Sequence, residues 1–126
     1  MRLWHESLIP KLPRQWLLAQ HRECCALRGN GWGKKHSTVD YVFRYPRIWL
    51  CVYHGKVMAE MEKRGYKVCD TWRDCNYRGG KREPDKHSSR LCNWIVECSP
   101  TYPEHNDAYL AECIEILKGK GVEVDG

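Results

Sequence analysis

The sequence has no long apolar run and only one phenylalanine among its 126 residues. A transmembrane helix needs about 20 consecutive apolar residues, so we expect no membrane-spanning segment and no membrane partner. Charged residues and two prolines interrupt the first 18 residues, unlike a secretory signal, which predicts a cytoplasmic protein. The phosphate-binding and zinc-protease patterns G-x-x-x-x-G-K-[ST], G-x-G-x-x-G and H-E-x-x-H are also missing.

The eight cysteines do not follow a zinc-site spacing. Five residues separate Cys69 from Cys75 and Cys92 from Cys98, whereas structural zinc sites place two to four residues between paired ligands. In a chain without an export signal, reduced thiols are expected instead of disulfides. We therefore expect no metal and no cofactor, although a metal-binding structural protein using these four cysteines remains a weaker alternative.

Basic residues and amphipathic aromatics are both abundant. Six Trp and seven Tyr accompany the single Phe, and such rings suit base stacking as well as protein cores. Residues 1–98 hold 19 of the 21 Lys and Arg but 10 of the 16 Asp and Glu, whereas residues 99–126 are net acidic. A basic body favours a polyanionic partner, nucleic acid first, although a solvated basic surface has the same composition.

The apolar pattern predicts three helices in one all-α domain spanning residues 1–126. The first is expected from Pro13 to Leu27 or Arg28, where a glycine-rich loop stops it. The second is expected over 46–64. The third is expected to begin near Pro103, with Thr101 and Glu104 as a possible capping box, and to end at Gly119 or Gly121.

The connecting segments carry weaker signals. Residues 1–13 read as an irregular arm with five apolar anchors, which are Leu3, Trp4, Leu8, Ile9 and Leu12. Residues 38–43 favour a strand-like or extended stretch. Residues 73–90 read as a long, exposed basic loop of the kind that is often functional or disordered.

Two groups of residues are candidates for function. Arg22 and Glu23 are neighbours on the polar face of the first helix, which also carries Gln15, and a surface ion pair is the simpler explanation for them. Around the glycine loop, Arg28, Lys34 and Lys35 suit phosphate binding, although a solvated turn explains them nearly as well. His21 and His54 fall on apolar helix faces, which favours core histidines over metal ligands.

Three segments resemble a known family. Residues 12–23, L-P-R-Q-W-L-L-A-Q-H-R-E, are similar to the L-x-x-Q-x-L-x-A-x-x-R-E first helix of the pyrimidine-dimer DNA glycosylases of endonuclease V type. The opening M-R-L-W resembles that family's N-terminal arm, and residues 60–66 resemble the E-x-x-K-R-G-aromatic end of its second helix. The resemblance covers about two thirds of the chain and is weakest over residues 67–98.

The resemblance implies a DNA-repair enzyme that acts as a monomer on damaged double-stranded DNA. In such enzymes the α-amine of the N-terminus attacks the sugar C1′, the base is expelled, and a Schiff base leads to strand cleavage by β-elimination. By carry-over, Met1 supplies the amine, Glu23 assists the proton transfers, and Arg2, Arg22 and Gln15 bind the damaged strand. An unperturbed α-amine has a pKa of about 7.7–8.0, and a neighbouring positive charge lowers it.

The chain departs from the family pattern in three places. Arg follows Met1 where the phage members expose a threonine, so the nucleophile here is the amine of Met1 itself. The family's second basic position after the glutamate is Ala26, for which Arg28 is a possible substitute. The aromatic C-terminal tail is replaced by an acidic one. A non-catalytic nucleic-acid-binding module on the same scaffold is therefore the alternative hypothesis.

Overall fold

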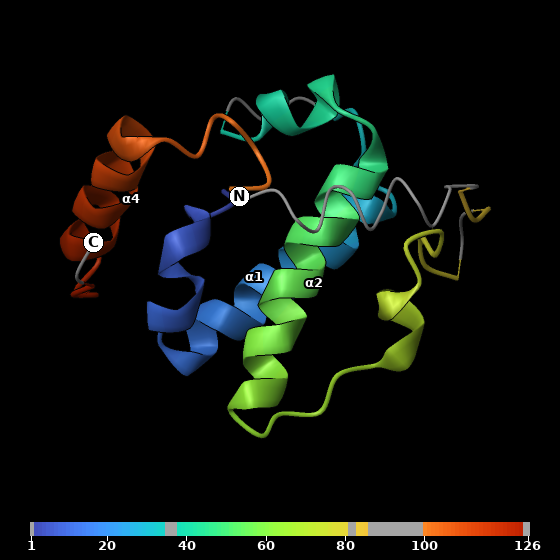
Figure 1. Cartoon of the computed structure of the whole chain (residues 1–126), viewed down its shortest axis with the longest axis horizontal. Coiled ribbons are helices and arrows are strands. Elements are labelled where there is room, and N and C mark those ends of the chain that lie inside the picture. The colour runs from blue at the N-terminus through green and yellow to red at the C-terminus, as the bar shows by residue number, and fades with distance from the viewer. Residues whose placement is uncertain (1, 35–37, 81–82, 86–99, 125–126) are drawn as a thin grey trace.

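The structure is a computed structural model that describes residues 2–34, 38–80, 83–85 and 100–124. Three α-helices carry the described part of the chain: α1 (Arg14–Arg28), α2 (Arg47–Lys63) and α4 (Asp107–Gly119). Three short 3-10 helices connect them: η1 (Glu6–Lys11), η2 (Asp40–Arg44) and η3 (Asp70–Arg73). The described residues contain no strand, so the all-α prediction is confirmed. Helices α1 and α2 cross at the centre, and α4 lies on one side next to the N-terminal arm (Figure 1).

Proline and glycine set the limits of α1 as predicted. The carbonyl of Pro13 accepts hydrogen bonds from the N–H groups of Trp16 and Leu17, both at 3.0 Å. At the other end the Gly29 N–H donates to the Cys25 carbonyl at 3.1 Å. A Cβ on Gly31 would lie 2.8 Å from the Ala26 carbonyl oxygen, so only glycine lets the chain turn back this closely.

Helix α2 also begins after a proline and ends before a glycine, and it matches its predicted range to within one residue at each end. Gly65 has a φ of +85°, and its N–H and that of Tyr66 close the last turn on the carbonyls of Glu62 and Met61. Nine residues of α2 are buried, on every side of the helix. It is therefore the central element, against which α1, the arm and η2 pack.

The predicted start of the third helix is wrong. Helix α4 begins at Asp107, and Asn106 caps it by accepting the Tyr109 N–H at 2.9 Å. Thr101 instead donates its backbone N–H to the Glu6 carboxylate at 2.8 Å, and Glu104 accepts from the Tyr45 hydroxyl at 3.0 Å. Thr101 and Glu104 therefore make tertiary hydrogen bonds and do not cap the helix. The N-cap residue is Asn106, and asparagine is among the preferred residues at this position.

Two connecting segments also differ from expectation. The segment expected to be strand-like holds η2, because no strand exists among the described residues to pair with it and its valines turn into the core. The arm contains η1, yet all five predicted anchors are buried. Helix α4 holds the arm in place: the Tyr109 hydroxyl donates to the Leu3 carbonyl, and Glu112 pairs with Arg2 at 3.3 Å.

The basic loop expected over 73–90 is only partly described. Residues 73, 74, 80, 83 and 84 are exposed as expected, whereas residues 75–79 and 85 are half-buried. The Arg78 guanidinium donates to the Arg28 carbonyl at 2.8 Å. Residues 81–82 and 86–99, including Cys92 and Cys98, lie outside the described residues. None of the six described cysteines forms a disulfide.

Candidate active site

A polar pocket of about 360 Å³ opens where the N-terminal arm, α1 and α4 meet. Residues from distant parts of the sequence line it, namely Arg2, Trp4, Trp16, Ala19, Gln20, Glu23, Thr38, Ile116 and Lys120. The lining combines one carboxylate, Glu23, with the cationic side chains of Arg2 and Lys120 and the aromatic rings of Trp4 and Trp16. The cationic and aromatic groups can bind an anionic ligand that contains a ring, and the carboxylate can transfer protons to or from that ligand.

Gln20 is the residue that ties the arm to this pocket. It is 1% exposed. Its amide oxygen accepts the Trp4 N–H at 2.8 Å and the Tyr53 hydroxyl at 3.1 Å. Its amide nitrogen donates to the Arg2 carbonyl at 3.1 Å and to the Glu23 carboxylate at 3.0 Å. One buried side chain therefore fixes both the arm and the carboxylate.

Glu23 is half-buried, and its surroundings change the pKa of its carboxyl group in opposite directions. Burial raises the pKa of its carboxyl group. The Arg2 backbone N–H and the Gln20 amide, which hydrogen-bond to the carboxylate, and the Lys120 charge lower it. A carboxyl group whose pKa is raised by burial holds a proton more readily than an exposed one, which favours a role in proton transfer. No surface ion pair with Arg22 is formed among the described residues.

Two indole rings and one ammonium group form the wall facing Glu23. Trp4 is buried and meets Trp16 edge to face, with ring centroids 5.9 Å apart. The Lys120 ammonium lies 5.6 Å from the centroid of the Trp16 ring. Lys120 is the C-cap residue of α4, so the last helix contributes directly to the pocket.

The structure brings together only some of the predicted site residues. Arg2 and Glu23 line the pocket. Arg22 and Gln15 are exposed on α1 outside it, and Gln15 borders a separate hollow with Pro13, Arg14 and Leu18. Lys34 is exposed beside another pocket at the end of α1. Met1 and Lys35 lie outside the described residues.

Arg28 is a correction to the predicted DNA-binding set. It is 2% exposed, and its guanidinium donates to the carbonyls of Trp72, Asp74 and Tyr77 at 2.7–2.8 Å. It also lies 5.0 Å from the Trp72 ring centroid. Arg28 holds the 72–77 segment onto α1, and its charge is turned inward where a phosphate does not reach it.

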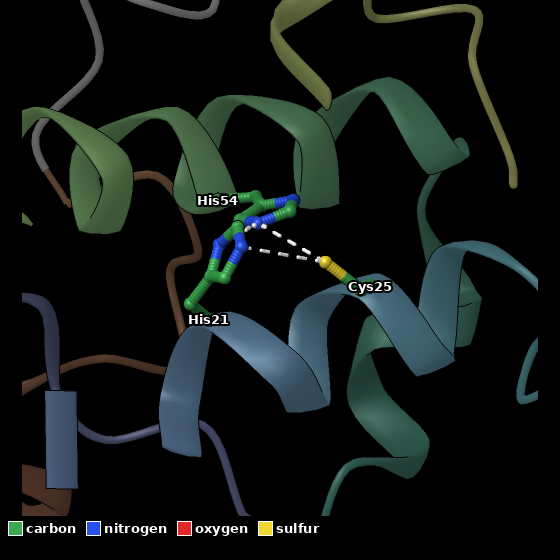
Figure 2. A group of neighbouring side chains, drawn as sticks. All are labelled: His21, Cys25 and His54. Carbon is green, nitrogen blue, oxygen red and sulfur yellow. Dashed lines mark hydrogen bonds between the residues drawn. The ribbon is translucent and has the colours of Figure 1, made fainter. Parts of the chain in front are cut away.

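Near Arg28, one group of potential metal ligands lies close together within the described part of the chain: His21, Cys25 and His54. His21 and Cys25 are four residues apart on α1 and so share a face, and His54 points at them from α2 (Figure 2). Their candidate ligand atoms lie within 4.8 Å of one another.

Hydrogen-bond directions show how this cluster is organised. The Arg28 guanidinium can only donate, so His54 Nδ1, 3.0 Å away, accepts. A neutral His54 then carries its proton on Nε2 and donates to His21 Nδ1 at 2.8 Å. His21 in turn carries its proton on Nε2, which faces the Cys25 sulfur at 3.8 Å. In this arrangement neither Nε2 atom has a lone pair for a metal ion, which favours the predicted core histidines.

Three histidines in the interior predict how stability depends on pH. Burial lowers the pKa of His21 and, to a greater extent, of His54, and nearby arginines lower both further. Burial also lowers the pKa of His105 to about 3. Below an unfolded-state pKa of about 6.5, the unfolded chain therefore binds these protons before the folded chain does.

We expect the free energy of unfolding to be independent of these groups above about pH 7.5. As the pH falls below 6.5, the buried His54 and His105 should each lower it by about 1.4 kcal/mol per pH unit until the folded-state pKa of each is reached. The half-buried His21 should contribute less, because solvent screens its charge. Urea denaturation at pH 7.5, 6.5, 5.5 and 4.5 measures the slope. A free energy of unfolding that stays constant down to pH 4.5 would contradict the assignment of these histidines as neutral.

Sequence reasoning missed most of the residues that line the pocket, among them Gln20, Trp16 and Lys120. Gln20 precedes Glu23 by three residues, a spacing that places both side chains on neighbouring positions of a helix, and this was the available signal. Trp16 had no distinguishing pattern among six tryptophans. Lys120 is 97 positions from Glu23 in the sequence, and only the packing of α4 against the arm brings them together.

The fold and the pocket define a small all-α protein whose N-terminal arm closes a carboxylate-containing site on its first long helix. A family model described as pyrimidine dimer DNA glycosylase matches residues 1–74. The chain therefore belongs to the pyrimidine dimer DNA glycosylase family, as the resemblance predicted. The matched segment contains the arm, α1 and α2, whereas α4 lies beyond it. Comparison with curated proteins gave no match, and comparison with solved structures gave none either.

Proposed function

We propose that this protein is a DNA glycosylase with abasic-site lyase activity, working as a single-domain monomer on damaged double-stranded DNA. The observation that carries the proposal is the position of Glu23. Its half-buried carboxylate accepts a hydrogen bond from the Gln20 amide at 3.0 Å, and the same amide donates to the carbonyl of Arg2 at 3.1 Å. Arg2 is the residue that follows the proposed nucleophile. No helix of the described residues has the length and apolar character to cross a bilayer.

Covalent geometry supports the pairing of Met1 with Glu23. Consecutive Cα atoms are about 3.8 Å apart, so a group on the residue before Arg2 is within reach of what Arg2 contacts. Arg2 is anchored through its carbonyl by Gln20 and through its side chain by Glu112. We therefore propose that the α-amine of Met1 works beside Glu23.

The proposed reaction begins when the neutral amine attacks C1′ of the damaged nucleotide. The bond between C1′ and the base breaks, and the base leaves with the electron pair and takes up a proton. The amine nitrogen gives up one of its two protons to the Glu23 carboxylate, which passes it to the ring oxygen as the sugar ring opens. A protonated Schiff base and a 4′-hydroxyl result. Removal of a C2′ proton then breaks the C3′–O bond, and the 3′ phosphate leaves. Glu23 is the group placed to carry protons between these steps.

The cationic residues around the pocket are proposed to hold the DNA backbone. Arg2 and Lys120 lie in the pocket itself, while Arg22 and Lys34 are exposed along the same helix and the loop after it. Phosphate contacts of this kind fix the position and orientation of the duplex. Gln15 and Lys35 complete the proposed DNA-binding set. An enzyme acting on chromosomal DNA would work in the cytoplasm, at the nucleoid.

Sodium borohydride trapping tests the proposal, because the reagent reduces a Schiff base to a stable covalent bond. The protein is incubated with a duplex that carries one abasic site, and the same duplex without the site is the control. We expect a covalent protein–DNA complex on the abasic duplex only. Protein acetylated at its N-terminus should bind the duplex but give no complex.

Binding of both duplexes without any trapped complex, while a known lyase traps in parallel, would reject the lyase mechanism. That result, with binding weakened by salt, would favour the non-catalytic nucleic-acid-binding module.

A further inference from the structure

The N-terminal arm reaches η1 through residues 2–5, which have no regular secondary structure and no strand to pair with in the described part of the chain. Side chains of the helices bond its backbone instead. Gln20 of α1 donates to the Arg2 carbonyl at 3.1 Å, and Tyr53 of α2 donates to the Trp4 carbonyl at 2.6 Å. Both of these helices lie within the segment that matches the family model.

The carbonyl between these two is bonded from outside that segment. Leu3 is fully buried, and its carbonyl accepts the hydroxyl hydrogen of Tyr109 in α4. Because a buried carbonyl without a donor is unfavourable, this hydrogen bond fixes a part of the arm that α1 and α2 do not reach. Three consecutive carbonyls of the arm are therefore held by three different helices.

Tyr109 is itself held in place. Its N–H donates to the Asn106 side chain at 2.9 Å, and its ring stacks on the buried His105 ring, with centroids 5.0 Å apart and an interplanar angle of 27°. Nδ1 of His105 accepts the Glu6 N–H at 3.2 Å, so the neutral ring carries its proton on Nε2 and donates to the Tyr41 hydroxyl at 2.6 Å. Burial raises the pKa of the Tyr109 hydroxyl, which keeps it protonated and able to donate.

The Arg2 side chain is bound to the same helix. Its guanidinium lies 5.7 Å from the centroid of the Tyr109 ring and pairs with Glu112 at 3.3 Å. Tyr109 and Glu112 are three residues apart and so occupy neighbouring positions on the surface of α4. Helix α4 therefore contacts Leu3 through its backbone and Arg2 through its side chain.

We infer that Tyr109 is a positioning residue for the proposed reaction, because its hydroxyl fixes the arm that carries the attacking amine. The inference rests on the proposed function, in which the residue before Arg2 supplies that amine. A displacement of about 1 Å can lower a rate by about 100-fold, so a small movement of the arm is enough to slow the covalent step. Tyr109 is not among the residues that line the Glu23 pocket, and it acts through the arm.

Tyr109→Phe tests this role, because it removes only the hydroxyl oxygen and keeps the ring that His105 and Arg2 contact. The rate of borohydride trapping on the abasic duplex is measured with saturating protein, from about pH 6 to about pH 9. We expect the rate constant to fall roughly ten-fold or more. The dissociation constant of the duplex should stay within about two-fold of wild type, because the phosphate contacts are unchanged. The pH of half-maximal rate should be unchanged, because the hydroxyl affects the place of the amine and not its ionisation.

Tyr45→Phe is the matched control. Tyr45 is also half-buried, and its hydroxyl makes a tertiary hydrogen bond to Glu104 at 3.0 Å instead of to the arm. Its trapping rate should stay within about two-fold of wild type. Hydrogen exchange gives a second measurement that does not depend on activity. The Trp4 amide, which donates to Gln20 at 2.8 Å, should exchange about five-fold faster or more in Tyr109→Phe, while amides in the middle of α2 keep their rates.

A trapping rate or a Trp4 exchange rate equal to wild type in Tyr109→Phe would overturn the positioning role. An equal fall of the trapping rate in Tyr109→Phe and Tyr45→Phe would overturn it too, since the effect would then be general destabilisation. So would a shifted pH of half-maximal rate, which would mean that the hydroxyl acts on the ionisation of the amine. Failure of the wild-type protein to trap would instead reject the proposed function, and the positioning role with it.

Discussion

Glu23→Gln is expected to lower base release and abasic-site cleavage by roughly 100-fold or more while DNA affinity stays within about three-fold of wild type. The reason is that an amide cannot accept or return a proton, although it keeps an oxygen to accept the hydrogen bond from Gln20. Single-turnover rates and a binding titration at fixed salt measure the two quantities. Glu115→Gln, on the exposed face of α4, removes an equal charge and should leave both unchanged.

The stability of the Glu23 variant provides an independent check. Burial raises the pKa of the Glu23 carboxyl group, which means that the folded protein pays a desolvation cost for its charged form. Glu23→Gln should therefore be as stable as wild type or more stable in urea at pH 7. A variant that loses activity because it unfolds more readily would contradict the catalytic role.

Arg28→Met is expected to lower the free energy of unfolding by roughly 3–5 kcal/mol. The substitution removes the buried guanidinium and leaves four acceptors without their donor: the carbonyls of Trp72, Asp74 and Tyr77, and Nδ1 of the buried His54. Urea denaturation at pH 7.5 measures the loss. We do not expect another donor to replace Arg28, because all four acceptors point at the position of its guanidinium group.

Arg22→Met is the matched control for stability, since Arg22 lies on the same helix but is exposed. Its effect on unfolding should stay within about 0.5 kcal/mol. If the two variants unfolded at the same urea concentration, the structural role of Arg28 would be wrong. If Arg28→Met were as stable as wild type but bound DNA more weakly, the prediction that Arg28 binds DNA would be supported instead.

The helices were predictable because local signals limit them. Pro13 and Pro46 precede α1 and α2, and Gly29 and Gly65 follow these helices or their last turn, so a pattern of a few residues predicts their ends. The start of α4 was not predictable in this way. Thr101 offered the same local signal as Asn106, and a hydrogen bond to Glu6, 95 residues away, decides between them.

At the site, too, the residues within short motifs were predictable, whereas those brought in by tertiary contacts were not. Glu23 and Arg2 were found through motifs that lie within short segments. Gln20, which connects them, has its partners in both the arm and α2, and Lys120 reaches the pocket from the far end of the chain. Arg28 was assigned to the surface because charged side chains are seldom buried. The three carbonyls that bind it belong to a segment with no regular pattern.

In the proposed mechanism the α-amine of Met1 is the group that bonds to DNA, and it does so beside Glu23. Borohydride-trapped complex on abasic DNA can be digested and sequenced by tandem mass spectrometry, which locates the attachment site. We predict that the sugar remnant is on the α-amine of the peptide that begins with Met1, and that Glu23→Gln reduces its yield at least ten-fold. A remnant on a lysine side chain, such as Lys120, would contradict the central claim.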